Sequence, residues 1–206
     1  IVDKARDKHV LSSKQAEALK DFSNLRNAIA HGRYYKSEPI AEPHEAVVKQ
    51  ISALRDIVVS PPDTLQVLQP QKVFTLTSAT SIMEAFSVIK DKDFSQIPIY
   101  DEGRFTALLT TNTIARWVAG DLSDNHVLDA ADIADIVEYK EPSDRAIFLA
   151  RTVSVQETVD ALSETDNQGH RPCAAVITEH GKVTERPLRL VAPADLPALF
   201  DALEWE

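Results

Sequence analysis

The stretch FSQIPIYD at residues 94–101 is followed, after a short turn, by ALLTTNT at residues 107–113. The β-branched and aromatic residues in these runs predict strands over 96–100 and 105–109. Residues 101–103 between them end on a glycine, which is typical of a tight hairpin turn. The threonines that close the second strand can cap a helix, which we expect over 112–118. This stretch therefore predicts a strand, a turn, a strand and a helix.

The same order of elements occurs twice. Before the stretch we expect a strand at 73–76 and a helix at 81–89. Ser81-Ile82-x-Glu84 matches Ser154-Val155-x-Glu157 at an offset of 73, and Gly103 matches Gly181 at an offset of 78. The second copy then contains, in order, a strand at 147–149, a helix at 154–162, strands at 173–177 and 188–191, and a helix at 193–203. Because repeats of this size cannot bury their apolar faces alone, the two copies are expected to pack together.

The predicted fold class is α+β, with two β-α-β-β-α repeats preceded by an all-α segment. We divide the chain into a helical segment (1–60), a linker (61–72), copy one (73–126), a connecting helix (127–145) and copy two (146–206). The linker begins at Ser60-Pro61-Pro62-Asp63, where consecutive prolines favour extended backbone. Because the chain opens on isoleucine and not on methionine, we expect residues before Ile1 and an incomplete helical segment.

The repeat order and the residues 94–113 resemble the CBS domain, whose members show a strand ending near Pro-Val, a glycine turn, and Gly-hydrophobic-hydrophobic-Thr-x-x-Asp opening the last helix. The resemblance implies a disc-like module formed by the two copies, with two clefts that hold AMP, ADP, ATP, dinucleotide messengers or S-adenosylmethionine. No cofactor is implied as a requirement.

The Thr-x-x-Asp motif is divided between the copies. Copy one has Thr110 but carries Thr113 in place of the aspartate, and copy two has Asp195 but carries Ala192 in place of the threonine. A threonine at a helix start can bind phosphate, and an aspartate one turn later can accept from ribose hydroxyls. At most one good nucleotide site is therefore expected. The motif glycine is replaced by Ala107 in copy one and Arg189 in copy two. The other candidate ligand-binding residues are Thr75, Gln96, Pro98 and Arg171. Alternatively, Thr110 and Asp195 are only helix caps, and the pair is a dimerising scaffold.

The helical segment carries a second motif. Ser13 can cap a helix from about Lys14, and Arg26, Asn27 and His31 near its end resemble the Arg-x4-His signature of HEPN domains. That resemblance implies a ribonuclease in which His31 transfers protons and Arg26 stabilises the phosphate. The alternative is a helix-end histidine bonded to backbone and an arginine in an ion pair.

The charge distribution and the residue composition indicate which functions to expect. The net charge is −10, and residues 1–40 hold eight Lys/Arg against five Asp/Glu while the remainder is strongly acidic, so RNA binding is expected only in the N-terminal segment. A single cysteine fits the reducing cytoplasm. No metal-ligand spacing and no membrane-spanning run is present in the sequence. We therefore expect a cytoplasmic regulatory homodimer that binds a small-molecule nucleotide, with a regulated ribonuclease or a non-catalytic scaffold as alternatives.

Overall fold

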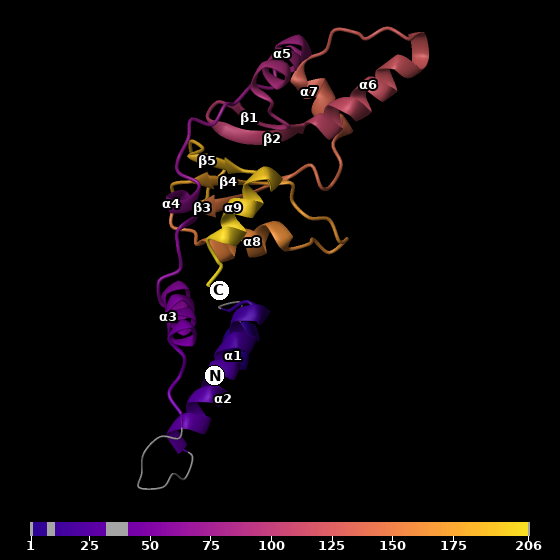
Figure 1. The fold of residues 1–206 in the computed structure, drawn as a ribbon. Coiled ribbons are helices and arrows are strands. Elements are labelled where there is room, and N and C mark those ends of the chain that lie inside the picture. Colours follow the sequence, from indigo (N-terminus) through magenta and orange to yellow (C-terminus); the bar gives the residue numbers. More distant parts are fainter. Residues whose placement is uncertain (1, 8–10, 32–40, 206) are drawn as a thin grey trace. The chain divides into compact units, whose positions relative to one another are not determined.

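The computed structural model describes residues 2–7, 11–31 and 41–205, and Figure 1 shows its elements. The chain divides into two compact units. The first consists of Ile1–Pro62 with Leu203–Glu206, and the second is Asp63–Ala202. The second unit contains copy one and copy two as far as Ala202, and it has the mixed helix-and-strand fold that the sequence predicted.

The first unit is helical, with α1 (Val2–Asp7), α2 (Ser13–His31) and α3 (Glu45–Val59). Ser12, and not Ser13 as predicted, caps α2: its hydroxyl accepts from the Gln15 amide at 3.2 Å, and the Gln15 side chain accepts from the Ser12 amide at 2.9 Å. This reciprocal arrangement is a capping box, and it places the cap one residue before the predicted position. The side chain of Leu54 in α3 is fully buried.

Copy one is built on a hairpin of β1 (Gln96–Asp101) and β2 (Arg104–Thr110). Its predicted first strand is reduced to a single parallel bridge between Leu76 and Ile99. Helix α5 (Ile82–Lys92) precedes the hairpin, and α6 (Thr111–Asn125) follows it. The buried residues of these elements form one apolar core. Copy one therefore has the predicted order, with a final helix longer than expected.

Copy two contains a three-stranded sheet in the order β3 (Ala146–Ala150), β4 (Ala174–Thr178), β5 (Arg189–Val191). β3 and β4 are parallel, and β4 and β5 are antiparallel. Helix α8 (Val155–Ser163) connects β3 to β4, because a parallel pair requires a crossover. A 3₁₀ turn η3 (Pro193–Asp195) and α9 (Leu196–Asp201) close the copy. All five residues of β4 are buried, so this strand is the centre of the copy.

Each copy is completed by a short helix that precedes the other copy. Helix α4 (Thr64–Val67) comes before copy one, yet the Thr64 amide donates to the Val153 carbonyl at 3.0 Å, and the Thr64 and Thr158 hydroxyls lie 2.7 Å apart in a buried contact. Figure 1 accordingly shows α4, in purple, among the orange elements of copy two. The residues 63–68 thus belong structurally to copy two.

Helix α7 (Ile133–Ile136), which continues into a 3₁₀ turn η2 (Val137–Tyr139), forms the reciprocal contact. The Ile82 amide donates to the Ala131 carbonyl at 3.0 Å, and the Ile133 amide donates to the Thr80 carbonyl at 2.9 Å. The bridges Asp63–Ser154 and Ser81–Asp132 are related in the same way. The two copies therefore exchange their preceding helices.

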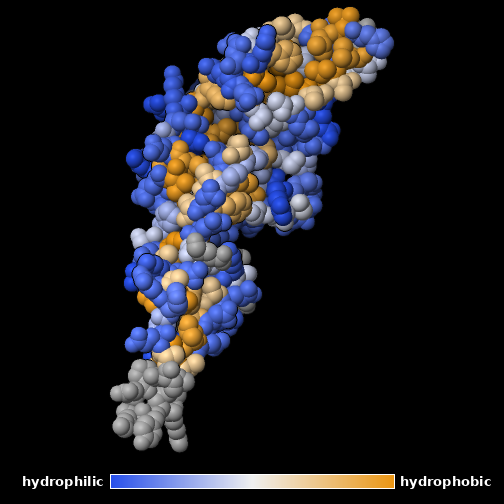
Figure 2. Space-filling view, viewed as in Figure 1, coloured by the Kyte–Doolittle hydropathy of each residue, from blue (hydrophilic) through white to orange (hydrophobic). Residues whose placement is uncertain are grey.

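The prediction of a continuous connecting helix from residue 127 was wrong. α6 ends where His126 takes a left-handed backbone conformation (φ 63°), which an α-helix cannot continue. The next helix starts only after Asp132, whose side chain takes part in a capping box with Asp135. Val127 and Leu128 between the two helices are 60% and 43% exposed, and Figure 2 shows hydrophobic residues gathered over the end of α6 and the segment that follows it.

Gly103 and Gly181, the matched glycines of the two copies, allow a test of the backbone conformation at their turns. Gly103 (φ +77°) has open space around the position of a Cβ, whereas a Cβ on Gly181 (φ +74°) would lie 3.2 Å from the Ala150 nitrogen and 3.3 Å from the Leu149 carbonyl carbon. Both alanine variants incur the left-handed strain of about 1 kcal/mol, and only Gly181→Ala adds a backbone clash. Urea denaturation should show a loss for Gly181→Ala of roughly 2 kcal/mol or more. Equal losses for the two variants would contradict this packing.

Glu185 organises the turn between β4 and β5 and gives a prediction about pH. Its Oε2 accepts from the His180 amide at 2.7 Å and from the Thr178 hydroxyl at 2.9 Å. These bonds, the His180 amide first, lower the pKa of Glu185 from 4.5 to about 2. Because the folded pKa is depressed, the stabilisation is complete above pH 4.5 and is lost as the pH falls towards 2.

Glu185→Gln should therefore lower the urea midpoint at neutral pH, and the difference from the unmodified protein should shrink as the pH is lowered below 4.5. The matched control is Glu179→Gln, which removes an exposed carboxylate paired with Arg151 at 3.3 Å. An exposed pair contributes little, so the control should change the midpoint less. A pH-independent difference for Glu185→Gln would show that the carboxylate is not the stabilising group.

Candidate functional site

Several polar side chains of copy one meet at the start of α6. Thr110 ends β2 in an extended conformation and caps α6, since its hydroxyl accepts from the Thr113 amide at 2.9 Å. The hydroxyls of Thr110 and Thr113 lie 3.0 Å apart, and both residues are buried. The prediction that Thr110 is a helix cap is thus confirmed. Two buried hydroxyl groups in this position need a further acceptor.

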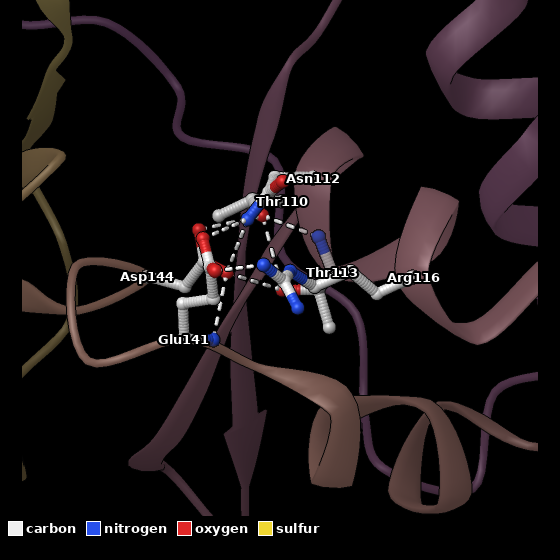
Figure 3. Close-up of polar contacts among 6 residues, drawn as sticks. All are labelled: Thr110, Asn112, Thr113, Arg116, Glu141 and Asp144. Atoms are coloured by element: carbon white, nitrogen blue, oxygen red, sulfur yellow. Dashed lines mark hydrogen bonds and ion pairs between the residues drawn. The ribbon is translucent and has the colours of Figure 1, made fainter. Parts of the chain in front are cut away.

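Asp144 supplies that acceptor from the segment just before β3 (Figure 3). Its Oδ1 accepts from the Thr110 hydroxyl at 3.0 Å. Its Oδ2 accepts from the Thr113 hydroxyl at 3.1 Å, from the Asn112 side-chain amide at 3.0 Å and from the Glu141 backbone amide at 3.0 Å. The residue is only 7% exposed. A buried carboxylate is stable only when it is this well bonded, so Asp144 joins copy one firmly to the segment entering copy two.

Glu141 forms the outer edge of the same group. Its carboxylate accepts from Asn112 at 3.0 Å and pairs with Arg116, one turn further along α6. Figure 3 shows Arg116 directed at Glu141, while the two threonines are directed at Asp144. The cationic side chain is therefore neutralised by one carboxylate, and Asp144 has hydroxyl and amide donors only. The site is acidic overall.

The equivalent position in copy two has a different construction. Arg189, at the start of β5, donates to Asp195 Oδ1 at 2.7 Å and to the Leu68 and Gln69 carbonyls at 3.0 and 3.3 Å. Asp195 Oδ2 accepts from the Ala192 amide at 2.9 Å, so this carboxylate satisfies the amide that precedes η3, and it makes no side-chain cap bond to α9. The side chains of the pair are 13% and 19% exposed. Here too the motif of one copy is tied to the segment leading into the other.

The remaining predicted residues are distributed as follows. Gln96 is paired with Thr110 across the hairpin, and Pro98 is buried opposite Leu108, with its carbonyl accepting from Leu76. Thr75 is half-buried, next to Leu76. Arg171 is exposed in the loop before β4, and its neighbour His170 accepts a bond from Arg145. The structure therefore gathers Thr110, Thr113 and Gln96 at one site.

Asn112, Arg116, Glu141 and Asp144 in these sites were not predicted, and neither was the ion pair of Arg189 with Asp195. Arg189 had a signal in the sequence, because it replaces the motif glycine. Asp144 had none, since it lies in a polar loop of unremarkable composition. Its importance arises only from the contact with copy one.

The N-terminal motif residues also lie together. On α2, the Arg26 guanidinium donates to the Asn27 side chain at 3.1 Å and lies 2.7 Å from His31 Nε2. All three side chains are exposed. The arginine thus contacts the histidine five residues later, and a phosphate approaching this helix end could meet both.

Two further properties concern the described parts of the chain. Within 2–7, 11–31 and 41–205, no group of three or more His, Cys, Asp or Glu is placed to hold a metal ion. Among the helices formed by these residues, none is long and apolar enough to cross a membrane. Burial, followed by the charge of Asp144, raises the pKa of the Cys173 thiol to about 11, so the thiol is protonated at neutral pH.

The chain is similar to a known protein family and to one known protein. Residues 48–120 match the family model of the CBS domain. A magnesium transporter, MgtE, of Thermus thermophilus is 31% identical over 108 residues, which are 50% of this chain and 24% of that protein. The chain thus matches about a quarter of the length of this relative.

Solved structures that are similar to this chain contain CBS domains. A putative signal-transduction protein with CBS domains from Burkholderia ambifaria has a TM-score of 0.50 and 15% identity, covering 68% of this chain and 93% of its own. The CBS domain pair of protein MJ0100, in complex with 5′-methylthioadenosine and S-adenosyl-L-methionine, has a TM-score of 0.48 and 21% identity over 69% of this chain and 100% of its own. Residues 48–120 are therefore similar to a CBS domain, and the second unit has the fold of proteins with CBS domains.

Proposed function

We propose that the chain is a regulatory module whose CBS pair senses an adenine nucleotide or a related adenine-containing ligand. The observation that supports this most directly is the bonding of Thr110 and Thr113 to Asp144. These hydroxyls stand at the start of a 15-residue helix, where a motif position of the CBS family would meet a ligand. A ligand bound there touches copy one and the segment leading into copy two at the same time.

Such a site can regulate, because ligand binding and the arrangement of the copies are linked. A ligand shifts a conformational equilibrium only through its different affinity for the two states. At the copy-one motif any ligand that engages Thr110 must compete with, or add to, the bonds to Asp144. At the copy-two motif it must do the same with Arg189, which also holds the end of α4. At each motif position, therefore, the side chains can bond either to the segment that leads into the other copy or to a ligand.

Ligand binding can be measured by the melting temperature of the full chain with AMP, ADP, ATP, cyclic dinucleotides and S-adenosylmethionine. A ligand at about 100 times its Kd adds roughly 2.7 kcal/mol to the free energy of unfolding. Thr110→Val should weaken the response about tenfold in Kd, because it removes one buried hydroxyl. Thr111→Val, an exposed neighbour, is the matched control and should respond like the unmodified protein. If no ligand raises the melting temperature at millimolar concentration, the proposed sensing role is wrong for this set.

A HEPN-like ribonuclease is the second candidate function, and it is favoured by one observation. The 2.7 Å approach of Arg26 to His31 places a cation and a proton-transfer group together on an exposed helix end. In such an enzyme His31 would act as general acid or base in attack by the 2′-hydroxyl, and Arg26 would stabilise the phosphate.

The ribonuclease hypothesis predicts cleavage of single-stranded RNA and not of the matching DNA, which lacks the 2′-hydroxyl. His31→Ala and Arg26→Ala should each reduce the rate by about 100-fold or more. Arg55→Ala on α3 is the control, because Arg55 is exposed and bonds only to the adjacent Asp56 within the described contacts. Equal rates for His31→Ala and the unmodified protein would remove His31 from the mechanism.

We also propose that the protein is a cytoplasmic homodimer. Leu25 on α2 and Val48 on α3 are large hydrophobic side chains that are 40% and 44% exposed. A second copy of the chain could cover them. A single, half-buried cysteine supports a reducing compartment.

A further inference from the structure

The last strands of the two copies differ at the motif position that is glycine in the family. Residues 189–192 of copy two are Arg-Leu-Val-Ala, whereas residues 107–110 of copy one are Ala-Leu-Leu-Thr. Ala107 is buried and carries only a methyl group. Arg189, by contrast, reaches from β5 to the Asp195 carboxylate, 2.7 Å away. A long cationic side chain therefore lies beside the motif of copy two, where copy one has a methyl group.

Both terminal nitrogens of the Arg189 guanidinium are bonded. Nη2 donates to Asp195 Oδ1 at 2.7 Å, and Nη1 donates to the Leu68 and Gln69 carbonyls at 3.0 and 3.3 Å. The side chains of Arg189 and Asp195 are 13% and 19% exposed, so water has little access to the pair. A bond between two ionised groups is stronger than a bond between neutral ones. Arg189 is therefore held firmly in the copy-two motif.

Asp195 is the group of copy two that could accept from a ribose, and both of its oxygens already have a donor. Oδ1 accepts from Arg189, and Oδ2 accepts from the Ala192 amide at 2.9 Å. A ribose hydroxyl that took the place of Arg189 would separate a guanidinium from its carboxylate where little water can replace either partner. Breaking a shielded ion pair in this way is strongly destabilising, and a neutral hydroxyl returns less than the charged donor it displaces.

The segment after α4 adds a second cost to the displacement of Arg189. Gln69 has a left-handed backbone conformation (φ 55°), which is unfavourable for residues other than glycine. Arg189 bonds to the carbonyl of Gln69 and to that of Leu68 before it. A ligand that moved the guanidinium would therefore also break the side-chain bonds that hold this segment.

We propose that Arg189 occupies the copy-two motif as an internal substitute for a ligand, so that copy two takes no adenine nucleotide and the module binds one per chain, at copy one. This rests on the proposed function, because it assumes that copy one binds an adenine-containing ligand. Copy two is then the constant half of the module. Its arginine holds the residues after α4 at every ligand concentration, and only the bonds around Thr110 respond to the ligand.

Copy one supplies the design of a variant that opens copy two. Arg189→Ala combined with Ala192→Thr gives residues 189–192 the Ala-x-x-Thr pattern of copy one and retains Asp195. AMP is the probe, and NMR titration of the full-length protein follows the backbone amides of Thr113 for copy one and Ala194 for copy two. In the unmodified protein AMP should shift Thr113 only. In the double variant it should also shift Ala194, with a Kd at copy two at least about tenfold lower than in the unmodified protein.

Ala192→Thr alone is the matched control, because it adds the hydroxyl and leaves Arg189 in place. It should show no binding of AMP at copy two. Asp195→Asn in the otherwise unmodified protein tests the proposal even if the double variant does not fold, because it keeps the shape of the side chain. This substitution should leave the Kd for AMP unchanged. Asp195→Asn added to the double variant should instead weaken the second site by about tenfold or more, because a ribose hydroxyl then meets a neutral acceptor.

The results for the two amides separate this proposal from the proposed function. The role of Arg189 is overturned if AMP shifts Ala194 in the unmodified protein, if Asp195→Asn weakens AMP binding, or if a folded double variant binds AMP no better at copy two than Ala192→Thr alone. Ligand sensing stands in each case as long as Thr113 shifts. If AMP shifts neither amide in the unmodified protein, sensing of AMP fails, and a shift of Ala194 in the double variant would still support the role of Arg189.

Discussion

The structure of the second unit depends on the exchange of α4 and α7 between the copies. Among the described residues, the backbone amide of Thr64 donates to Val153 of copy two, and those of Ile82 and Ile133 donate to partners across the α7 contact of copy one. Buried amides without a partner are costly, so neither copy is complete alone. The exchange also explains why α4 and α7 can be so short: isolated helices of four residues are unstable, and these two are held by the copies they join.

The exchange places the candidate site residues between the copies. Because the chain must cross from α7 to β3, residues 141–145 pass beside the start of α6, and Asp144 meets Thr110 and Thr113 there. The chain leaving α4 passes β5 in the same way, where Arg189 holds the Leu68 and Gln69 carbonyls. Both connecting segments are thus fastened by a charged side chain to a motif. Residues 68–69 and 141–145 have the composition of linkers, but in the structure they contact the candidate sites.

Local pattern was enough to predict the hairpin, the order of elements in each copy and the capping role of Thr110. These features depend on neighbours in sequence: alternation in 96–109, Gly103 in the turn, and a threonine before a helix. The helix exchange could not be predicted, because it rests on backbone bonds between residues 64 and 153 or 82 and 131, which leave no side-chain pattern. Asp144 was missed for the same reason. The prediction of a continuous helix after residue 127 was wrong because His126 takes a left-handed conformation there, and no glycine or proline at or next to this position marks the end of the helix.

Charged side chains bind residues 68–69 and residues 141–145 to the motifs. These bonds limit how the two copies can move relative to each other. Separating copy one from residues 141–145 would leave Asp144 buried without its threonine donors. Freeing residues 68–69 would leave Arg189 with Asp195 alone among its described partners. An uncompensated buried charge is strongly destabilising, so intermediate displacements are disfavoured. Either the bonds remain, or the segment moves far enough for water or a ligand to replace them. Motion between the copies is therefore expected to be a transition between discrete states, which is the behaviour a regulatory module requires.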